Sequence, residues 1–289
     1  MKVKYNFKNE IKNYTKFWRN TPELLPTYTS ISINRFNIKN FKSKTYIEKY
    51  FVTSEQSNAM LLDVLFYLQQ YTPSLSFRRS CREGICGSCG MNVNGTNVLA
   101  CLFSLKKNIV PNKFLKKDVV KYNHLMINPL PHMPVVKDLV VSLDHFYKQY
   151  NSISPFRKKA ESDINQTSNQ LNMTKKKDRA LIDGVYECIL CACCSTSCPS
   201  YWWNSQSYLG PAVLLQAFRW IMDPNDHYTL ERLRYLDDGD KLHKCHNIMN
   251  CSLTCPKGLK PAESISQIKN MTKTVNIKTL NFRNSNLIN

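Results

Sequence analysis

The sequence lacks any run of apolar residues long enough to cross a membrane. A spanning helix needs about eighteen consecutive apolar residues, and the best candidate, residues 211–222, is interrupted by Gln216 and Arg219. Acidic residues are also scarce, with 21 Asp and Glu against 40 Lys and Arg in 289 residues. We therefore expect no transmembrane span in this chain, so that any work at a membrane would require partner subunits to hold it there.

The excess positive charge is not clustered as it would be on a nucleic-acid-binding surface. The net charge of +19 is spread over both halves of the chain and its two tails, whereas a nucleic-acid-binding face gathers its basic residues into one patch or stripe. We interpret the charge as belonging to solvated faces, with an acidic partner or an anionic lipid surface as the functional alternative. Binding to nucleic acid is not expected.

The N-terminal residues 1–27 form a basic extension. Their first twenty residues contain six basic side chains and one acid, Glu10, but no serine or alanine and a single arginine. This charge balance resembles that of a mitochondrial transit peptide, although the composition is atypical. A cleaved presequence and an uncleaved surface extension both remain open.

Twelve cysteines are present, and those near the C-terminus repeat one motif. Cys188 begins a C-x2-C-x2-C-x3-C-P run whose last cysteine is Cys198, and Cys245 begins a run in the same frame whose last cysteine is Cys255. In two-cluster ferredoxins the first three cysteines of such a run hold one cluster, while the fourth ligates the other cluster. The repeat therefore predicts a pair of cubane iron–sulfur sites.

The crossover rule assigns the ligands of both clusters. The [4Fe-4S] cluster is assigned four thiolates, Cys188, Cys191, Cys194 and Cys255. The second cluster is assigned only three, Cys198, Cys245 and Cys251. Its run has Ile248 in the second cysteine position, and isoleucine cannot ligate iron. We therefore expect a [3Fe-4S] cluster there, with one corner of the cube empty.

A third site is predicted upstream, where the cysteines have the C-x4-C-x2-C spacing of plant-type [2Fe-2S] ferredoxins. Its four ligands are Cys81, Cys86, Cys89 and Cys101. The cluster and its thiolates carry a formal charge of about −2, so the loop has to approach with backbone N–H groups and cations. Residues suited to this are present in the loop, namely Gly84, Gly87, Gly90, Arg78, Arg79 and Arg82. The glycines allow positive φ angles and leave room for amides to point at sulfur.

Structural zinc is the rival interpretation of short cysteine pairs, because zinc also prefers four thiolates at such spacings. The runs interlock as a ferredoxin pair, and the site beside Ile248 lacks a fourth ligand, which favours clusters. Disulfides are disfavoured because cysteines this close on short turns have poor bridging geometry. Cys193 is left over, and we interpret it as a small buried residue beside a cluster. Free thiolates indicate a reducing compartment, either the cytosol or the mitochondrial matrix.

The remaining pattern predicts an α+β chain whose first domain is a β-grasp [2Fe-2S] ferredoxin domain over residues 28–134. Strands are expected over residues 28–36 and 45–52, followed by a helix that opens at Asn58 and ends before Pro73. A hairpin is expected around Asn94-Gly95. A linker helix over residues 135–150 and a polar excursion over residues 154–178 complete a linker region, residues 135–178.

The second domain is predicted to be an α-helical two-cluster ferredoxin domain over residues 179–272, followed by a C-terminal tail over residues 273–289. The expected helices cover residues 178–187, 211–222, 229–236 and 261–271. Pro211 and Pro261 stand where a first helical turn tolerates proline. We expect the two clusters to supply much of the stability of this domain.

Three segments resemble the signatures of one family, the iron–sulfur subunit of succinate dehydrogenase, also called respiratory complex II. They are residues 76–89, 186–204 and 245–251, and the likeness extends from about Tyr28 to Met271. The resemblance implies an electron-transfer subunit between a flavoprotein subunit with covalently bound FAD, which oxidises succinate, and membrane anchor subunits that help to bind ubiquinone. It implies a peripheral position on the matrix side of the mitochondrial inner membrane, or on the cytoplasmic side of a bacterial membrane.

The resemblance also implies the order of electron transfer and the residues at its quinone end. The order is FAD, [2Fe-2S], [4Fe-4S], [3Fe-4S] and ubiquinone, within the tricarboxylic acid cycle and the respiratory chain. The residues that match the family's quinone site are Pro199, Trp203, His246 and Ile248. We interpret Trp202 as interface packing on the anchor. No residue resembles a general base or nucleophile for succinate, so the chemistry at carbon must belong to another chain.

Other functions remain open at this point. The iron–sulfur subunit of a quinol:fumarate reductase has the same architecture, although the Ser-Tyr-Trp-Trp run after Cys198 favours the succinate-oxidising branch. A free-standing multi-cluster ferredoxin carrier would be a soluble monomer. A zinc-stabilised basic protein that binds nucleic acid would be colourless, and its binding would be sensitive to salt.

Overall fold

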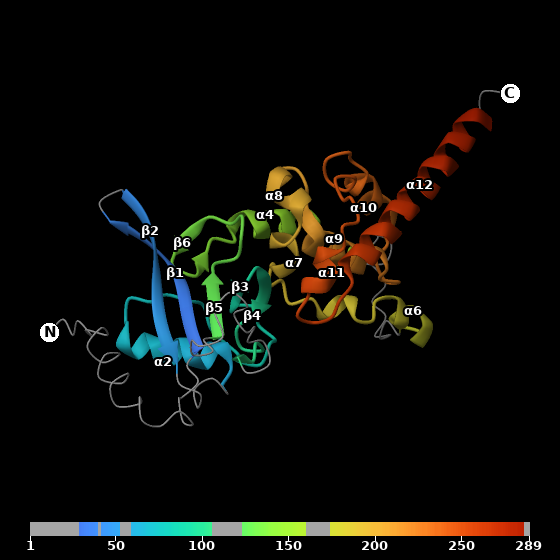
Figure 1. Ribbon diagram of the computed structural model, residues 1–289. Coiled ribbons are helices and arrows are strands. Elements are labelled where there is room, and N and C mark those ends of the chain that lie inside the picture. The colour runs from blue at the N-terminus through green and yellow to red at the C-terminus, as the bar shows by residue number, and fades with distance from the viewer. Residues whose placement is uncertain (1–28, 40–41, 53–58, 106–122, 160–173, 286–289) are drawn as a thin grey trace, which may run out of the picture.

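The structure is a computed structural model that describes residues 29–39, 42–52, 59–105, 123–159 and 174–285. The predicted N-terminal extension, the centre of the polar excursion and the end of the C-terminal tail lie outside the described residues. The described chain has a sheet-containing part and a helical part that lie side by side (Figure 1). No helix within these ranges is both long and apolar enough to cross a membrane.

One mixed sheet of five strands forms the first part, in the order β2-β1-β5-β3-β4. The strands are β1 (Thr29–Lys39), β2 (Lys42–Val52), β3 (Gly90–Val93), β4 (Thr96–Leu99) and β5 (Asn123–Asn128). Strand β1 pairs antiparallel with β2 and parallel with β5. Helix α2 (Leu61–Tyr71) lies across the sheet. This is the predicted β-grasp arrangement.

The short-range sequence signals of this part are confirmed. Helix α2 buries the apolar residues that recur at helical spacing, Leu61, Leu62, Val64, Leu65 and Leu68. They share a core with Ile31 and Ile33 of β1. The β3–β4 hairpin turns through Asn94 at φ 49° and Gly95 at φ 85°. Two positive φ angles are what a two-residue hairpin turn of this hand requires.

The predicted helix over residues 135–150 is wrong in its first half. That segment contains two short paired strands, β6 (Val135–Lys137) and β7 (Val140–Val141), and helix α4 begins only at Asp144 and ends at Ser152. Branched valine side chains favour strands over helices. The chain turns at Asp138, where φ is 47°. Hydrogen bonds to the buried Asp138 carboxylate hold this turn in place. The carboxylate accepts one from Arg35 at 2.9 Å and one from the Ser76 N–H at 2.9 Å.

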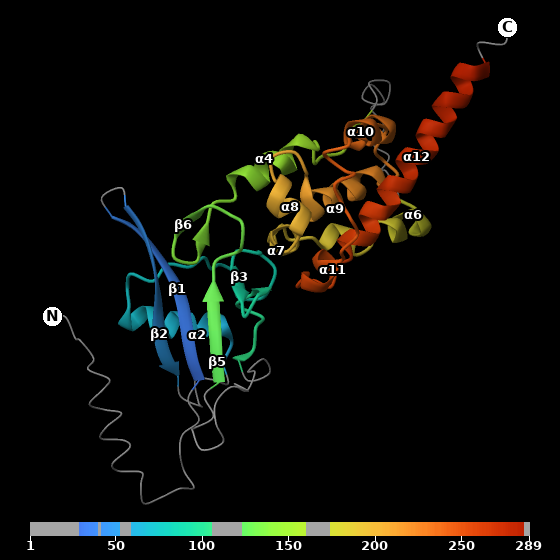
Figure 2. The same ribbon diagram turned by 45° about the horizontal axis from the view of Figure 1, so that its top comes forward.

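The second part is helical and forms around α9, as Figure 2 shows from a second direction. Its elements are α6 (Lys176–Leu181), η3 (Val185–Glu187), α7 (Cys193–Thr196), α8 (Pro199–Asn204), α9 (Gly210–Ile221), α10 (Thr229–Leu236), α11 (Asn250–Thr254) and α12 (Pro261–Ser285). Helix α9 contacts α4, α7, α10 and α12. The predicted helix over residues 178–187 is interrupted at Gly184, where φ is 75°.

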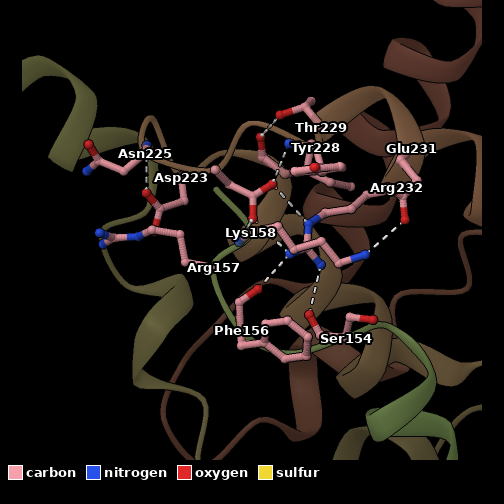
Figure 3. A network of polar contacts seen from close by, with 12 residues as sticks. Ser154, Phe156, Arg157, Lys158, Asp223, Asn225, Tyr228, Thr229, Glu231 and Arg232 are labelled. Atoms are coloured by element: carbon pink, nitrogen blue, oxygen red, sulfur yellow. Dashed lines mark hydrogen bonds and ion pairs between the residues drawn. The ribbon is translucent and has the colours of Figure 1, made fainter. Parts of the chain in front are cut away.

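A buried arginine ties the segment after α4 to α10 (Figure 3). Arg232 donates hydrogen bonds to the carbonyl oxygens of Ile153 and Ser154 at 2.9 Å and of Phe156 at 2.7 Å. It also forms an ion pair with Asp226 at 2.8 Å. Burial alone would raise the pKa of Asp226, but hydrogen bonds from Arg232 and from backbone N–H groups hold it below its ordinary value. The first residues of the polar excursion are therefore fixed to the helical part.

Candidate metal centres

The predicted [2Fe-2S] loop directs backbone N–H groups at a thiol. The Cys81 sulfur accepts hydrogen bonds from the N–H groups of Glu83 at 3.3 Å, Ile85 at 3.4 Å and Cys86 at 3.3 Å. Three N–H groups aimed at one sulfur form a concavity that favours an anion. The loop therefore directs its backbone donors at the Cys81 sulfur, which is the arrangement expected around a cluster ligand.

The other predicted ligands of this site are brought together by the hairpin. The Ala100 N–H donates to the Cys89 carbonyl at 3.1 Å, and the sulfurs of Cys89 and Cys101 lie 3.4 Å apart. Burial raises the pKa of Cys89 to about 12. The pKa of Cys86 falls to about 6, because hydrogen bonds from Ser88 and Cys81 outweigh the opposing effect of burial. Buried paired thiols favour the neutral form, and a ferric ion would supply positive charge that stabilises their thiolates.

The glycines of the loop have two different functions. Gly84 and Gly87 have φ angles of 73° and 70°, as predicted. Gly90 does not belong to the positive-φ group and begins β3 instead. A Cβ atom at Gly90 would lie 3.3 Å from the Cys191 carbonyl, and one at Gly87 would lie 2.8 Å from the Ile189 carbonyl. These two glycines therefore let the [2Fe-2S] loop touch the first C-terminal cysteine run.

Two of the three predicted arginines share one aromatic ring. The guanidinium groups of Arg79 and Arg82 lie 4.5 Å and 4.3 Å from the centre of the Phe66 ring. Phe66 is fixed in turn by an edge-to-face contact with Phe77 at 5.5 Å. Cation–π contacts of this kind hold the arginine stems in place. Positive charge is thus fixed beside the loop, as its predicted anionic cluster requires.

The four predicted [4Fe-4S] ligands line one cavity of about 340 Å³. They are Cys188, Cys191, Cys194 and Cys255, so a cysteine from the second run joins three from the first. Most of the remaining wall is apolar, including Ala212, Leu215 and Leu259. Burial raises the pKa of Cys194 well above its ordinary value. Cys193, the unassigned cysteine, is completely buried beside this site, as predicted.

The three predicted [3Fe-4S] ligands line a second cavity, of about 320 Å³. Cys245 and Cys251 come from the second run and Cys198 from the first. Three of the predicted quinone-end residues, Pro199, His246 and Ile248, line the same cavity. The fourth, Trp203, is not part of its wall and lies one helical turn beyond Pro199, with 77% of its surface exposed.

The two cysteine runs fold alike. Leu190 and Ala192 have φ angles of 54° and 61°, and the equivalent residues of the second run, Asn247 and Met249, have φ angles of 56° and 68°. A short helix follows in each run, α7 in the first and α11 in the second. Left-handed conformations are unfavourable for residues with a Cβ atom, so their repetition at matching positions indicates that both loops serve the same purpose.

The thiols of these sites surround spaces and do not converge on a point. Among the residues that the structure describes, no group of three or more His, Cys, Asp or Glu side chains is placed to hold a single metal ion. The ligands of a cubane cluster bind different iron atoms and stand around the cluster.

Sequence reasoning missed the residues that join the two parts of the molecule. Asn97 of β4 donates hydrogen bonds to the Cys193 carbonyl at 3.0 Å and to the Thr196 hydroxyl at 2.9 Å. Asn92 donates to the Asn97 side-chain oxygen at 2.8 Å. In the sequence these two asparagines stand beside an Asn-Gly turn and have the composition of an ordinary hairpin, so no local signal marks their long-range contacts.

A second joint involves Trp202, which was predicted to pack on an anchor subunit. The Trp202 ring stacks on His132 at 4.5 Å with an interplanar angle of 13°, and its N–H donates to the Thr196 carbonyl at 2.5 Å. The structure therefore gives Trp202 packing partners within the chain. Thr196 is held at both its hydroxyl and its carbonyl by this joint and the Asn97 joint.

Lys269 of α12 was also missed. Its ammonium group donates a hydrogen bond to the Cys245 carbonyl at 2.7 Å, so a positive charge lies beside the second cavity. Ala262 and Ile265, which precede it on α12, line that cavity. Because α12 carries Lys269 four residues after Ile265, these residues share one helix face. The sequence shows only an ordinary lysine in a basic helix.

Comparisons with known proteins identify both domains. A family model for a 2Fe-2S iron-sulfur cluster binding domain matches residues 30–148, and one for a 4Fe-4S dicluster domain matches residues 187–260. The fold is similar to that of a chain in the Mycobacterium smegmatis Sdh1 complex in the apo form, with a TM-score of 0.70 and 20% identity over 86% of this chain and 96% of that chain. A hypothetical protein from Helicobacter pylori has a TM-score of 0.48 and 15% identity over 86% of this chain and 40% of its own. The chain is therefore an α+β iron–sulfur protein with an N-terminal 2Fe-2S ferredoxin domain and a helical 4Fe-4S domain.

Proposed function

We propose that this chain, whose two cluster-binding domains and fold fit an iron–sulfur subunit of succinate dehydrogenase, is the electron-transfer subunit of that enzyme. Electrons would pass from the FAD of a flavoprotein subunit through [2Fe-2S], [4Fe-4S] and [3Fe-4S] clusters to ubiquinone at a membrane anchor. The clusters supply the one-electron chemistry, with potentials set by cluster type, hydrogen bonding and exposure. The chain would serve the tricarboxylic acid cycle and the respiratory chain.

One observation carries this proposal. The seven thiols assigned as ligands in the two C-terminal runs divide crosswise into two cavities, one with four thiols and one with three. Ile248 stands in the wall of the second cavity, where the first has Cys191. This division supports Cys188, Cys191, Cys194 and Cys255 as [4Fe-4S] ligands and Cys198, Cys245 and Cys251 as [3Fe-4S] ligands. The loop around Cys81, Cys86, Cys89 and Cys101 is proposed to hold [2Fe-2S].

The contacts between the sites support a relay. The loop that carries Cys86 and Cys89 meets the run that begins at Cys188 through the close approach at Gly87 and Gly90. Helix α7 and the residues that follow it carry both Cys194 and Cys198, one ligand of each proposed cubane cluster. The proposed [2Fe-2S] site is therefore in contact with the proposed [4Fe-4S] site, and one continuous segment joins the latter to the proposed [3Fe-4S] site.

The surface next to the second cavity supports docking on an anchor and the proposed quinone end. Large apolar side chains are exposed on α8, α11 and the loop before α11, namely Trp203 at 77%, Ile248 at 51%, Met249 at 50% and Leu253 at 85%. Exposed apolar side chains of this size can mark an interaction surface. Pro199, Trp203, His246 and Ile248 are proposed to contact the quinone.

The proposed location is the matrix side of the mitochondrial inner membrane, with the cytoplasmic side of a bacterial membrane as the alternative. The basic N-terminal extension supports the mitochondrial location. Oxidation of succinate at carbon is proposed to belong to the flavoprotein partner.

Electron paramagnetic resonance of the native complex tests this function. The air-oxidised complex is expected to show a [3Fe-4S] signal that disappears when succinate is added, while a reduced [2Fe-2S] signal appears. Dithionite provides the control, because it reduces the clusters without requiring the flavoprotein reaction. Clusters that dithionite reduces but succinate does not would favour a fumarate reductase subunit or a free carrier. Absence of any oxidised [3Fe-4S] signal would contradict the ligand assignment.

A further inference from the structure

The Tyr208 hydroxyl is a buried polar group that the proposed relay does not use. Tyr208 is completely buried and lines the second cavity together with Cys198, Cys245 and Cys251. Its hydroxyl forms no hydrogen bond with a nitrogen or oxygen atom in the part of the chain that the structure describes, and it lies beside the Cys245 thiol. Leaving a buried hydroxyl without a partner costs about 1–3 kcal/mol. A partner that the protein atoms do not supply would remove that cost.

The backbone and ring of Tyr208 are fixed, so the hydroxyl cannot turn away from the cavity to reach water. The Tyr208 N–H donates to the Asn204 carbonyl at 2.9 Å, and its own carbonyl accepts a hydrogen bond from the Gln149 side chain at 3.0 Å. The ring meets that of Tyr201 edge to face, with the centres 6.4 Å apart. Three independent contacts therefore hold the residue at the cavity wall.

The Tyr208 hydroxyl is available as a donor at the cavity wall, where it lies among the thiols of Cys198, Cys245 and Cys251. A protonated phenol offers one O–H donor. The cavity wall combines three thiols with apolar side chains and with the polar residues Ser200, His246, Asn247 and Asn250. A cluster held by the three thiols would bring its sulfur atoms into the cavity as acceptors for the Tyr208 hydroxyl.

We propose that the Tyr208 hydroxyl donates a hydrogen bond to a sulfur of the iron–sulfur cluster in the second cavity and raises the reduction potential of that cluster. The inference rests on the proposed function, which assigns a cluster to this cavity. Hydrogen bonds to cluster sulfurs are one of the factors that set the potential, because a donor stabilises the more negative, reduced state. Tyr208 is thus a positioning and tuning residue, and it is not a ligand.

The first cavity provides an internal contrast. Among the described residues of its wall, none carries a hydroxyl group. The two cavities are otherwise similar in size and in the fold of their cysteine runs. The second wall carries two hydroxyl groups, those of Ser200 and Tyr208, and a tyrosine donor present at only one of the two equivalent sites would help to separate their potentials. The Tyr208 hydroxyl would therefore favour electron arrival at the second cluster, next to the proposed quinone end.

Tyr208→Phe removes only the hydroxyl oxygen, and Tyr201→Phe is its matched control. Tyr201 is also buried, and it lies on α8, just before the loop that carries Tyr208. Its hydroxyl donates to the Gln149 side-chain oxygen at 2.9 Å, and the residue lines neither cavity. The measurement is a redox titration of the cluster-loaded chain in its native complex, followed by electron paramagnetic resonance. Thermal unfolding of each variant is recorded in parallel.

The expected results for the two variants are opposite. Tyr208→Phe lowers the reduction equilibrium of the [3Fe-4S] cluster by about tenfold, which is about 59 mV for a one-electron couple, and leaves the other two clusters unchanged. Tyr201→Phe lowers the thermal midpoint because it removes a satisfied buried hydrogen bond, and it leaves the [3Fe-4S] potential unchanged. A structural effect alone would not produce this crossed pattern.

A second substitution covers the case in which Tyr208→Phe fails to assemble its cluster. Fluorotyrosine introduced at position 208 alone keeps the shape and makes the phenol a stronger donor, so the [3Fe-4S] potential should rise. An unchanged potential in Tyr208→Phe or in the fluorotyrosine protein, with the cluster signal intact, would overturn the inference. A wild-type complex without a [3Fe-4S] signal would instead overturn the proposed function and this inference together.

Discussion

The two C-terminal cysteine runs have the same local fold, but they differ in one ligand and in their surroundings. Both loops place left-handed residues at equivalent positions, Leu190 and Ala192 in the first and Asn247 and Met249 in the second. The first cavity lies against the 2Fe-2S domain at Gly87. The second has Ile248 where the first has a cysteine, and exposed apolar side chains lie beside it.

The comparison shows that the backbone of such a run defines a cavity, whereas individual side chains determine what the cavity holds and what it faces. The left-handed residues and the short helices are common to both runs. Replacing the residue in the second cysteine position, Cys191 or Ile248, should therefore leave the cavity in place. The short helices of the two runs differ in their exposure to solvent. Leu253 of α11 is 85% exposed, whereas the equivalent residue of α7, Thr196, is completely buried. Five predictions follow, from the largest expected effect to the smallest.

Removing the last cysteine of each run should have the largest effect, and it should act crosswise. Cys255→Ala is expected to abolish the [4Fe-4S] signal and spare the [3Fe-4S] signal, because Cys255 lines the first cavity. Cys198→Ala is expected to do the reverse, because Cys198 lines the second. Paramagnetic resonance and iron content measure both. Loss of the cluster of the same run in either variant would show that the ligands do not cross.

Ile248→Cys should convert the second site without unfolding the domain. The new thiol would stand in the cavity wall at the position equivalent to Cys191, so the site would acquire the fourth ligand that a [4Fe-4S] cluster uses. The oxidised [3Fe-4S] signal is expected to disappear, and the iron content of the chain to rise. Leu253→Cys adds a thiol outside the cavity and serves as the control. Persistence of the [3Fe-4S] signal in Ile248→Cys would count against the equivalence of the two runs.

Arg232→Met should lower stability without altering either cluster, since Arg232 lines neither cavity. It leaves the buried Asp226 carboxylate without its ion pair, which typically costs about 3–5 kcal/mol. Arg234→Met, on the exposed face of the same helix, is the matched control. Thermal unfolding measures the loss, and cluster signals at low temperature should match those of the wild type.

The same ion pair predicts how the loss depends on pH. The pKa of Asp226 is held below its ordinary value in the folded chain, so its stabilisation is present above the unfolded pKa of about 3.9 and is lost only as the pH falls through the lower folded value. The stability difference between Arg232→Met and the wild type should therefore be equal at pH 6 and pH 8. A difference that changed across this range would indicate that another group is responsible.

Thr196→Val should have the smallest effect, because it disturbs the joint between the domains and leaves both cavities intact. The valine keeps the shape but cannot accept the hydrogen bond from Asn97, and an unsatisfied buried amide costs about 1–3 kcal/mol. Thr196→Ser retains the hydroxyl and should restore stability. Thermal unfolding compares the two, and equal losses in both variants would assign the effect to packing and not to the hydroxyl.

Local signals in the sequence predicted much of the fold. The periodicity of Leu61, Leu65 and Leu68 gave α2, the Asn94-Gly95 pair gave the hairpin, and Thr229–Leu236 agrees with α10. The prediction of a helix from Val135 was wrong because the conformation of this segment depends on a tertiary contact. That contact is the hydrogen bond between the buried Asp138 carboxylate and Arg35. Residue spacing alone does not reveal a partner more than a hundred residues away.

Cysteine spacing predicted which thiols the structure brings together, because ligand geometry restricts the spacing of residues within a run. The supporting residues had no such restriction. Asn97, Tyr208 and Lys269 reach the sites from a hairpin, a loop and a long helix, and each has an ordinary sequence context. Their contribution depends on three-dimensional placement, so it becomes visible only when the chain is folded.

The contact between the two domains depends on the absence of a side chain at Gly87. Any other residue there would meet the Ile189 carbonyl at 2.8 Å from its Cβ atom, in a backbone conformation that disfavours side chains. A missense change at this codon would therefore separate two loops that each retain all of their cysteines. Such an allele would produce a chain that passes every test of motif integrity and still cannot hold its first two sites side by side.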